Sequence, residues 1–400
     1  PLINSPVYTG VFVFTKKSLD IKTQEKPVLN YQFITTNTAL EDVCKAASEV
    51  SQIALDTEFV RIRTYYPHLG LIQMYDGKQI SLIDPLTITE WTPFVELLTN
   101  PAVLKYLHAG SEDLEVFSHQ FGCVPTPMID TQVVAAFLGY PISCGFATLV
   151  EKYEHIALDK SESRTDWLAR PLTEKQCQYA SGDVFYLLPL AKKLIAQAQE
   201  AGYMDAIVDE CEMIAERRQE TVSPELAYRD IGNAWQLRGQ QLACLKMLAE
   251  WRLNQARARD MALNFVVREE HLWSVARYLP TSLAELDALS LSGQEIRCHG
   301  RRLLDFVAKA KQIKDEDCPE PIGNLIEQPN YKKAFKAIKT VIQEVSEGQR
   351  YNPELLASRR QINQLLNIHW KIKTGEPELL SRWRKALLAE KITAILAQYP

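Results

Sequence analysis

The sequence Ile53-Ala54-Leu55-Asp56-Thr57-Glu58-Phe59 predicts the central strand of a sheet and a candidate site on that strand. Its apolar residues are typical of a strand that is buried on both faces. Because side chains alternate along a strand, Asp56 and Glu58 point to the same side. Two buried carboxylates repel each other, and a divalent cation would compensate their charge. Many strands simply end in acidic loops, so the interpretation depends on further ligands elsewhere in the chain.

Length and composition predict a water-soluble protein of several domains. The 400 residues exceed one ordinary hydrophobic core, so we expect two or three domains. No apolar run is long enough to span a membrane. Eight cysteines without a Cys-x-x-Cys pair indicate reduced thiols rather than disulfides or a zinc site. The apolar stretch 7–14 has no basic residues before it, unlike a secretory signal, so we expect a cytoplasmic protein. The net charge of −5 neither requires nor excludes nucleic acid.

Strand and helix patterns surround the central strand. Asp76-Gly77 is a strong hairpin signal, because glycine accepts the positive φ of a tight turn. Mixed strand and helix signals predict an α/β domain over residues 29–222. Residues 1–28 show no clear periodicity and are interpreted as an N-terminal extension. The other predicted strands are 31–35, 69–75, 79–84 and 104–107, with a helix over 38–50.

Further carboxylates lie on two predicted helices. Ser111 is expected to cap the first helix, on which Asp113 occupies the apolar side. Tyr179 and Asp183 stand at i and i+4 of a later helix, and Leu187 continues its apolar stripe. Each feature alone has a simpler explanation. Asp113 would merely complement the helix dipole, and Tyr179 with Asp183 would form an ordinary buried hydrogen bond.

Taken together, the core-facing acidic residues predict a metal site formed by Asp56, Glu58, Asp113 and Asp183. Two divalent cations would match the charge of four carboxylates. Because the set has no His or Cys, it favours Mg²⁺ or Mn²⁺ over zinc. Two such ions suit the hydrolysis of a phosphodiester. Tyr179 would orient the attacking water, since a phenol with a pKa of about 10 is a poor base at neutral pH.

These residues also carry a family resemblance. Their order, Asp-x-Glu, a helix-start Asp and Tyr-x-x-x-Asp, resembles the DEDDy branch of the DEDD 3′→5′ exonucleases, whose fold is ribonuclease H-like. Four segments resemble bacterial ribonuclease D more closely: 55–61, 108–117, 160–172 and 179–188. The resemblance implies a monomeric exoribonuclease that removes 5′-mononucleotides from RNA 3′ ends, with tRNA precursors as substrates. It also implies catalytic roles for Asp56, Glu58, Asp113, Tyr179 and Asp183.

The second half of the chain has only helical patterns. The family carries two HRDC domains after the nuclease, and residues 235–311 resemble the first well, whereas residues 331–400 resemble the second loosely. Proline-containing linkers at 223–224 and 318–321 mark the boundaries. We therefore predict an α/β ribonuclease H-like mixed-sheet exonuclease domain followed by two all-α HRDC-type bundles, 223–317 and 318–400. The predicted helices are 235–258, 267–279, 283–289, 295–310, 331–345, 353–367 and 377–398.

Several other residues near these motifs could contact the substrate. Exposed basic residues are usually just solvated, so we expect only one or two of them to hold phosphates. His108 is more simply a turn residue that caps a strand, and Trp167 more simply packs its loop. The candidate substrate residues are Phe59, Arg61, Arg63, Lys160, Arg164 and Arg170.

Two other functions fit the same residues. The motif does not distinguish RNA from DNA, because that choice depends on contacts to the 2′-hydroxyl, so a DNA-directed repair or proofreading exonuclease is one alternative. A non-catalytic RNA-binding scaffold is the other, although such scaffolds commonly lose a metal ligand. A glycosidase needs only two carboxylates. A helicase is excluded, because the chain has no Gly-x-x-x-x-Gly-Lys-Ser/Thr sequence.

Overall fold

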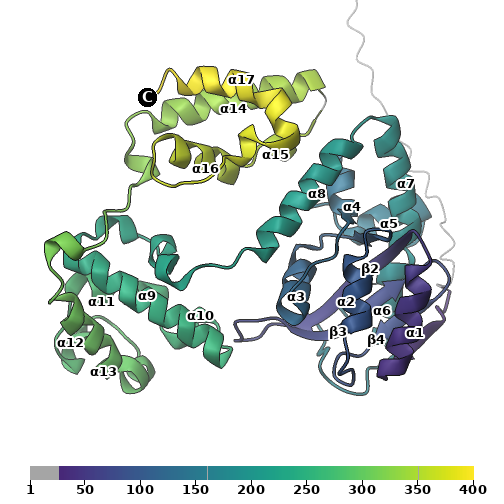
Figure 1. The fold of residues 1–400 in the computed structure, drawn as a ribbon, viewed down its shortest axis with the longest axis horizontal. Coiled ribbons are helices and arrows are strands. Elements are labelled where there is room, and N and C mark those ends of the chain that lie inside the picture. The colour runs from purple at the N-terminus through teal and green to yellow at the C-terminus, as the bar shows by residue number, and fades with distance from the viewer. Residues whose placement is uncertain (1–26, 160, 350) are drawn as a thin grey trace, which may run out of the picture.

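A mixed sheet of six strands forms the centre of the N-terminal domain in this computed structural model, which describes residues 27–159, 161–349 and 351–400 (Figure 1). The strand order is β1-β4-β3-β2-β5-β6. Strand β3 runs antiparallel to β2 and β4, and the other pairings are parallel. The predicted extension lies outside the described residues up to residue 26. The strands are β1 (Tyr31–Ile34), β2 (Gln52–Val60), β3 (His68–Tyr75), β4 (Ile80–Ile83), β5 (Leu104–Leu107) and β6 (Met128–Asp130).

The hairpin between β3 and β4 confirms the turn prediction. Gly77 has a φ of +91°. The Asp76 carboxylate accepts the backbone N–H groups of Lys78 and Gln79 at 2.8 and 2.7 Å. These bonds hold the turn, so β4 returns beside β3 with Gln73 opposite Leu82.

Helices cover both faces of the sheet. Asp56 and Glu58 project from one face of β2 and Thr57 from the other, since side chains alternate along a strand. Helix α6 packs across β2, β3 and β4, and α3 packs against β2 and β3. The helices of this domain are α1 (Asn37–Ser48), α2 (Thr92–Thr99), α3 (Ser111–Phe121), α4 (Thr131–Phe137), α5 (Phe146–Glu154), α6 (Glu174–Phe185), α7 (Leu187–Glu200) and α8 (Met204–Gln219).

Two helical bundles follow, each with its own apolar core. In the last bundle the helices predicted at 353–367 and 377–398 are each divided in two. In both cases a short first turn precedes a longer helix. The elements of the first bundle are η1 (Pro224–Asp230), η2 (Ala234–Gln236), α9 (Gly239–Arg259), α10 (Leu263–Val266), α11 (Glu269–Tyr278), α12 (Leu283–Ala288) and α13 (Gly293–Ala310). Those that follow are η3 (Asp315–Asp317), η4 (Leu325–Glu327), α14 (Tyr331–Gln349), α15 (Pro353–Leu356), α16 (Arg359–His369), η5 (Glu378–Leu380) and α17 (Arg382–Leu396). No helix in the described ranges is long and apolar enough to cross a membrane.

The last bundle docks on the nuclease domain through α8 and α17, which lie far apart in sequence (Figure 1). Arg384 is 1% exposed and pairs with Glu210. Its Nε and Nη2 donate to the carbonyl oxygens of Leu356 and Leu355 at 2.8 and 2.9 Å. Trp383 Nε1 also donates to Glu210 at 3.0 Å. A buried charge network therefore holds this bundle in place.

We expect Glu210→Gln to destabilise the protein by about 3–5 kcal/mol, because it leaves the buried Arg384 charge without its counter-charge. Urea unfolding measures the loss, and small-angle scattering detects release of the bundle. The matched control is Glu212→Gln, which breaks the exposed pair with Arg382 and should cost under about 1 kcal/mol. Equal effects of the two substitutions would contradict the assigned role of the buried pair.

Candidate active site

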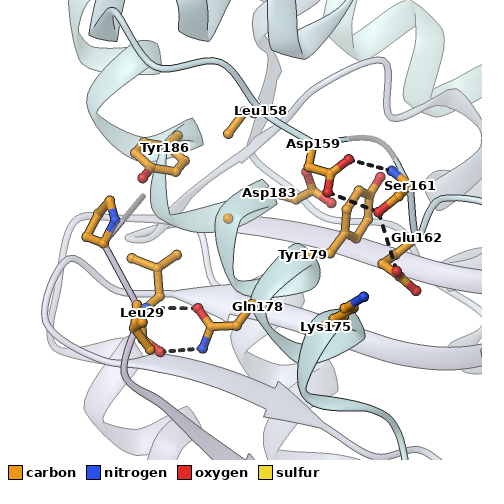
Figure 2. A pocket seen from close by; sticks show the side chains of 13 residues that line it. Leu29, Leu158, Asp159, Ser161, Glu162, Lys175, Gln178, Tyr179, Asp183 and Tyr186 are labelled. Carbon is orange, nitrogen blue, oxygen red and sulfur yellow. Dashed lines mark hydrogen bonds between the residues drawn. The ribbon is translucent and has the colours of Figure 1, made fainter. Parts of the chain in front are cut away.

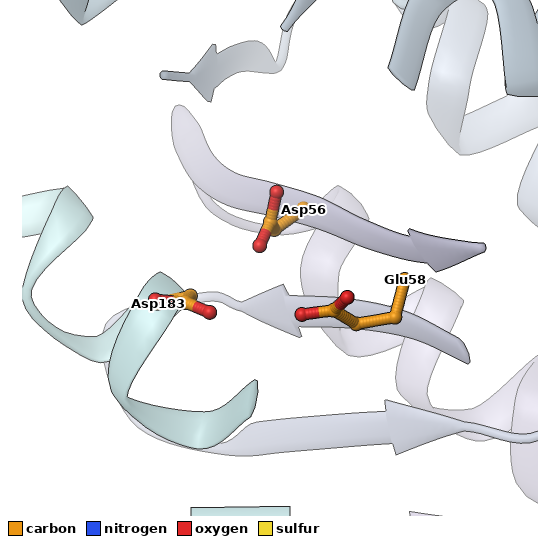
Figure 3. Close-up of side chains that lie close together, drawn as sticks. All are labelled: Asp56, Glu58 and Asp183. Atoms are coloured by element: carbon orange, nitrogen blue, oxygen red, sulfur yellow. The ribbon is translucent and has the colours of Figure 1, made fainter. Parts of the chain in front are cut away.

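Three carboxylates meet at the surface of the sheet. Oxygen atoms of Asp56, Glu58 and Asp183 all lie within 4.8 Å of one another. Figure 3 shows the two side chains from β2 and the one from α6 pointing toward a common centre. The strand period places Asp56 and Glu58 together, and the packing of α6 on β2 brings in Asp183.

Local sequence explains why α6 presents Asp183 at this point. Its N-terminus is a full capping box, in which Thr173 and Gln176 exchange side-chain and backbone hydrogen bonds. The helix ends at Phe185, and α7 begins at Leu187 after a junction at Tyr186. The apolar stripe of α6 therefore continues on a second helix, α7. Leu187 is buried, as its place in the apolar pattern indicated.

Asp113 lies on α3, which packs against β2, and its side chain contacts Thr57. Its carboxylate accepts the Thr57 backbone N–H at 3.1 Å and the Thr57 hydroxyl in a shorter bond. Among the described residues it is not part of the group of three carboxylates. Ser111 is not the cap of this helix. It is the first helical residue, Gly110 is the cap, and the Ser111 hydroxyl accepts hydrogen bonds from Arg218.

Burial and nearby negative charges raise the pKa of the three grouped carboxyls and of Asp113. Burial raises the pKa of Asp56 well above its usual value, with further increases from Asp113, Asp183 and Glu58. Burial and then Asp183 raise the pKa of Glu58 to about 9. Burial also raises the pKa of Asp183 to about 7 and that of Asp113 to about 6. Without a compensating cation, the site therefore holds protons at neutral pH.

Tyr179 lies one helical turn before Asp183 and hydrogen-bonds to it. Burial, the Asp183 charge and the Glu58 charge raise the pKa of the phenol above its ordinary value of 10.0. Its ring centroid is 6.1 Å from that of Trp167, which is buried as predicted. The hydroxyl therefore stays protonated at neutral pH and can donate a hydrogen bond, but it cannot act as a base.

A cavity of about 340 Å³ opens beside Tyr179 and Asp183. Figure 2 shows both side chains on one side of α6, with the loop around Ser161 facing them. Lys175 is the one basic side chain among the described residues that line this cavity. It stands four residues before Tyr179 on α6, and that spacing was a signal that the sequence reasoning missed.

Arg170, a candidate phosphate contact, has its donors engaged by groups of the protein itself. Nε and Nη2 donate to the Asp84 carboxylate at 2.8 and 2.7 Å. The remaining N–H groups reach the carbonyl oxygens of Gly70, Trp167 and Ala169 at 2.7 to 2.9 Å. All five guanidinium donors are thus engaged. Arg170 instead ties its loop to the end of β4.

The other candidate substrate residues have different surroundings. Arg61 pairs with Glu115 on α3. Arg63 lies with its guanidinium carbon 5.4 Å from the centroid of Phe265 in the first bundle. Arg164 is exposed and Phe59 is half-buried against the core. Lys160 lies outside the described residues.

Asp130 is a structural residue that the sequence reasoning missed. Its carboxylate accepts the backbone N–H groups of Ala109, Gly110 and Gln132 at 2.8 to 2.9 Å. These bonds hold the turn that leads into α3 and so position Asp113. The available signal was an acidic residue immediately after a strand and before a helix. His108 Nε2 donates to the Cys144 carbonyl oxygen at 3.1 Å, and its Nδ1 lies 2.9 Å from the Thr131 hydroxyl, so both ring nitrogens are engaged within the fold.

The residues present fit a divalent metal ion. All the ligands are carboxylate oxygens, as hard cations require, and their raised pKa values indicate a site built for added positive charge.

The metal-free protein should lose stability as pH rises, because carboxyls with raised pKa values must ionise against an unfavourable environment. The loss begins above the ordinary pKa of about 4 and continues through the folded values of about 6, 7 and 9.

We therefore expect the melting-temperature difference between Mg²⁺ and EDTA samples to be small at about pH 5 and to grow toward about pH 9. Differential scanning fluorimetry at constant ionic strength measures it. Ca²⁺-free buffers and a Glu212→Gln control, which removes an exposed carboxylate and leaves those of the site intact, separate the site from general salt effects. A difference that does not depend on pH would contradict this electrostatic account.

Comparison with known proteins agrees with the fold. Residues 31–199 match the 3'-5' exonuclease family model, and residues 241–307 match the HRDC domain. Residues 329–392 match the C-terminal HRDC domain of ribonuclease D. The sheet, the carboxylate group and these two helical domains define a 3′→5′ exonuclease with appended HRDC domains.

Similar proteins show which exonuclease family this is. The chain is 63% identical to ribonuclease D of Serratia proteamaculans and 59% identical to that of Escherichia coli, in each case over 93% of this chain and 100% of the relative. It resembles the crystal structure of E. coli RNase D with a TM-score of 0.92, over 93% of this chain and 100% of that one. The chain belongs to the ribonuclease D family and is a 3′→5′ exoribonuclease.

Proposed function

We propose that the enzyme hydrolyses the last phosphodiester of an RNA chain by a mechanism with two metal ions and releases 5′-mononucleotides. The observation that carries this proposal is the meeting of Asp56, Glu58 and Asp183 within 4.8 Å. Two ions, Mg²⁺ or Mn²⁺, would activate a water and stabilise the leaving oxygen when bound. Asp56, Glu58 and Asp183 would hold them, and Asp113 would complete the set from the side of α3.

The side chains of this protein would supply orientation and charge. Tyr179 would donate its hydroxyl hydrogen bond to the attacking water, because its raised pKa keeps the phenol protonated. Lys175 borders the cavity next to Tyr179 and would pair with a substrate phosphate. Thr57 would keep Asp113 in place through its two hydrogen bonds.

The substrates we propose are RNA 3′ ends, with tRNA precursors as the cellular class. The E. coli relative is described as an exoribonuclease involved in structured RNA processing, and this chain matches it over its full length. HRDC domains suggest further nucleic-acid contacts. We propose a cytoplasmic monomer with domains 29–222, 223–317 and 318–400 after an extension 1–28.

A gel assay tests the reaction. RNA and DNA strands of about twenty nucleotides, labelled at the 5′ end, are incubated with Mg²⁺, Mn²⁺ or EDTA. We expect a ladder that shortens from the 3′ end of RNA and is absent with EDTA. Equal digestion of DNA would favour the repair-type alternative. Binding of RNA without any cleavage would favour a scaffold.

A further inference from the structure

A second cavity lies in the first helical bundle. It has a volume of about 410 Å³ and is bordered by α10, the end of α9 and the start of α13. Phe265 borders it with 53% of its surface exposed. Arg63, from the loop after β2, lies beside the same ring. The Ala262 backbone N–H donates to the Arg63 carbonyl at 2.9 Å, which fixes this arrangement.

The charges around this cavity favour an anion. Arg259 and Arg268 line it. Among the described residues Arg259 and Arg63 have no carboxylate partner, and Arg268 has only a 4.0 Å contact to an exposed glutamate. Glu295 is the acidic residue of the lining, and its carboxylate is occupied by His271 and by the backbone N–H groups of Arg268 and Ser292.

We propose that this cavity binds a nucleotide of single-stranded RNA upstream of the 3′ end, a proposal that rests on the proposed function. An exposed phenyl ring beside unpaired guanidinium groups suits a base that stacks and phosphates that pair. Arg63 follows Glu58 by five residues, so their Cα atoms are at most about 18 Å apart. An RNA strand can therefore occupy the active site and this cavity together.

The test compares Phe265→Ala with a matched control, Tyr278→Ala, which removes another exposed ring of the same domain outside the cavity. For RNA of about twelve nucleotides, we expect KM to rise about ten-fold or more in Phe265→Ala, because each stacked base contributes substantially. For RNA of about three nucleotides, which is too short to reach the cavity, kcat and KM should not change. Arg259→Gln should make the plot of log binding constant against log salt concentration less steep by about one unit of slope, as expected for the loss of one phosphate contact.

Three outcomes separate the two proposals. An unchanged KM for long RNA in Phe265→Ala would overturn the subsite, even with full activity on short RNA. An equal rise of KM in Tyr278→Ala would also overturn it, because the effect would then be general to the bundle. Failure of the unmodified enzyme to cleave the short RNA would instead refute the proposed function.

A different observation concerns Gln73, next to the metal site. This residue lies in β3 directly opposite Asp56 in the antiparallel pair with β2, so both side chains project from the same face. It is 0% exposed, and neither atom of its amide has a protein hydrogen-bond partner. Buried amides without partners are rare and costly, so such a group beside a catalytic carboxylate requires an explanation.

The geometry points to Gln73 as a positioning residue that donates an N–H to the Asp56 carboxylate when a cation is bound, and so orients that ligand. Partners behind metal ligands commonly change metal affinity by ten-fold to a hundred-fold. Gln73→Met keeps the side-chain volume and removes the amide. It should therefore leave the metal-free protein equally or more stable, because a buried unpaired group disappears.

Two readouts test this role. We expect the affinity for Mn²⁺, titrated calorimetrically without RNA, to fall about ten-fold in Gln73→Met. The control is Ser181→Ala, which removes a different buried polar group without a partner, a hydroxyl on α6, and should leave Mn²⁺ affinity unchanged. Unchanged Mn²⁺ affinity in Gln73→Met would overturn the proposal, whatever happens to thermal stability.

Discussion

Replacing Asp183 by Asn lowers kcat by at least about a thousand-fold, or ~4 kcal/mol of transition-state stabilisation, if the three carboxylates hold the catalytic ions. Asn has nearly the same volume but lacks the charge that a hard cation requires. The Asp183 carboxylate comes from α6, opposite the two carboxylates of β2. Its loss therefore removes the metal ligand on that side of the site. Single-turnover hydrolysis of labelled RNA measures the effect.

The same substitution should make the metal-free protein more stable at about pH 8, because ionised Asp183 repels its neighbours there and its pKa is raised to about 7. RNA binding should remain. Loss of activity with higher metal-free stability and retained binding therefore distinguishes a ligand from a folding residue. Turnover close to that of the unmodified enzyme would refute the two-ion assignment.

Tyr179→Phe is expected to lower kcat by about a hundred-fold with little change in KM, since proton positioning by one side chain typically contributes about 10²–10⁴. In the metal-free protein the hydroxyl donates to Asp183, and with ions and substrate bound it would donate its one hydrogen to the attacking water instead. Because its pKa is raised, the pH–rate profile should keep its shape in the variant up to about pH 10.

The control for this experiment is Tyr186→Phe, which removes a hydroxyl from the same cavity, at the end of α6 and away from the carboxylates. Its activity should stay near that of the unmodified enzyme. A tyrosine that acted as a base would show an alkaline rise in rate that Tyr179→Phe abolishes, and such a rise would contradict the orienting role.

The predictions that depend on periodicity agree with the fold. Asp56 and Glu58 share a face because strands alternate, and Tyr179 and Asp183 share a face because helices turn every 3.6 residues. The hairpin at Asp76-Gly77 follows from the φ that glycine accepts. The roles of these residues in metal binding and catalysis stay predictions that the experiments above address.

The amino-acid sequence alone determined the sheet domain, the helical second half and the acidic residues that face the core, because these follow from patterns within short segments. Contacts between distant segments decided the rest. All the donors of Arg170 are taken by its own loop, β3 and the end of β4, and the last bundle docks on α8 through the buried pair of Arg384 and Glu210. Neither partnership leaves a local pattern, since its members meet only when the whole chain has folded.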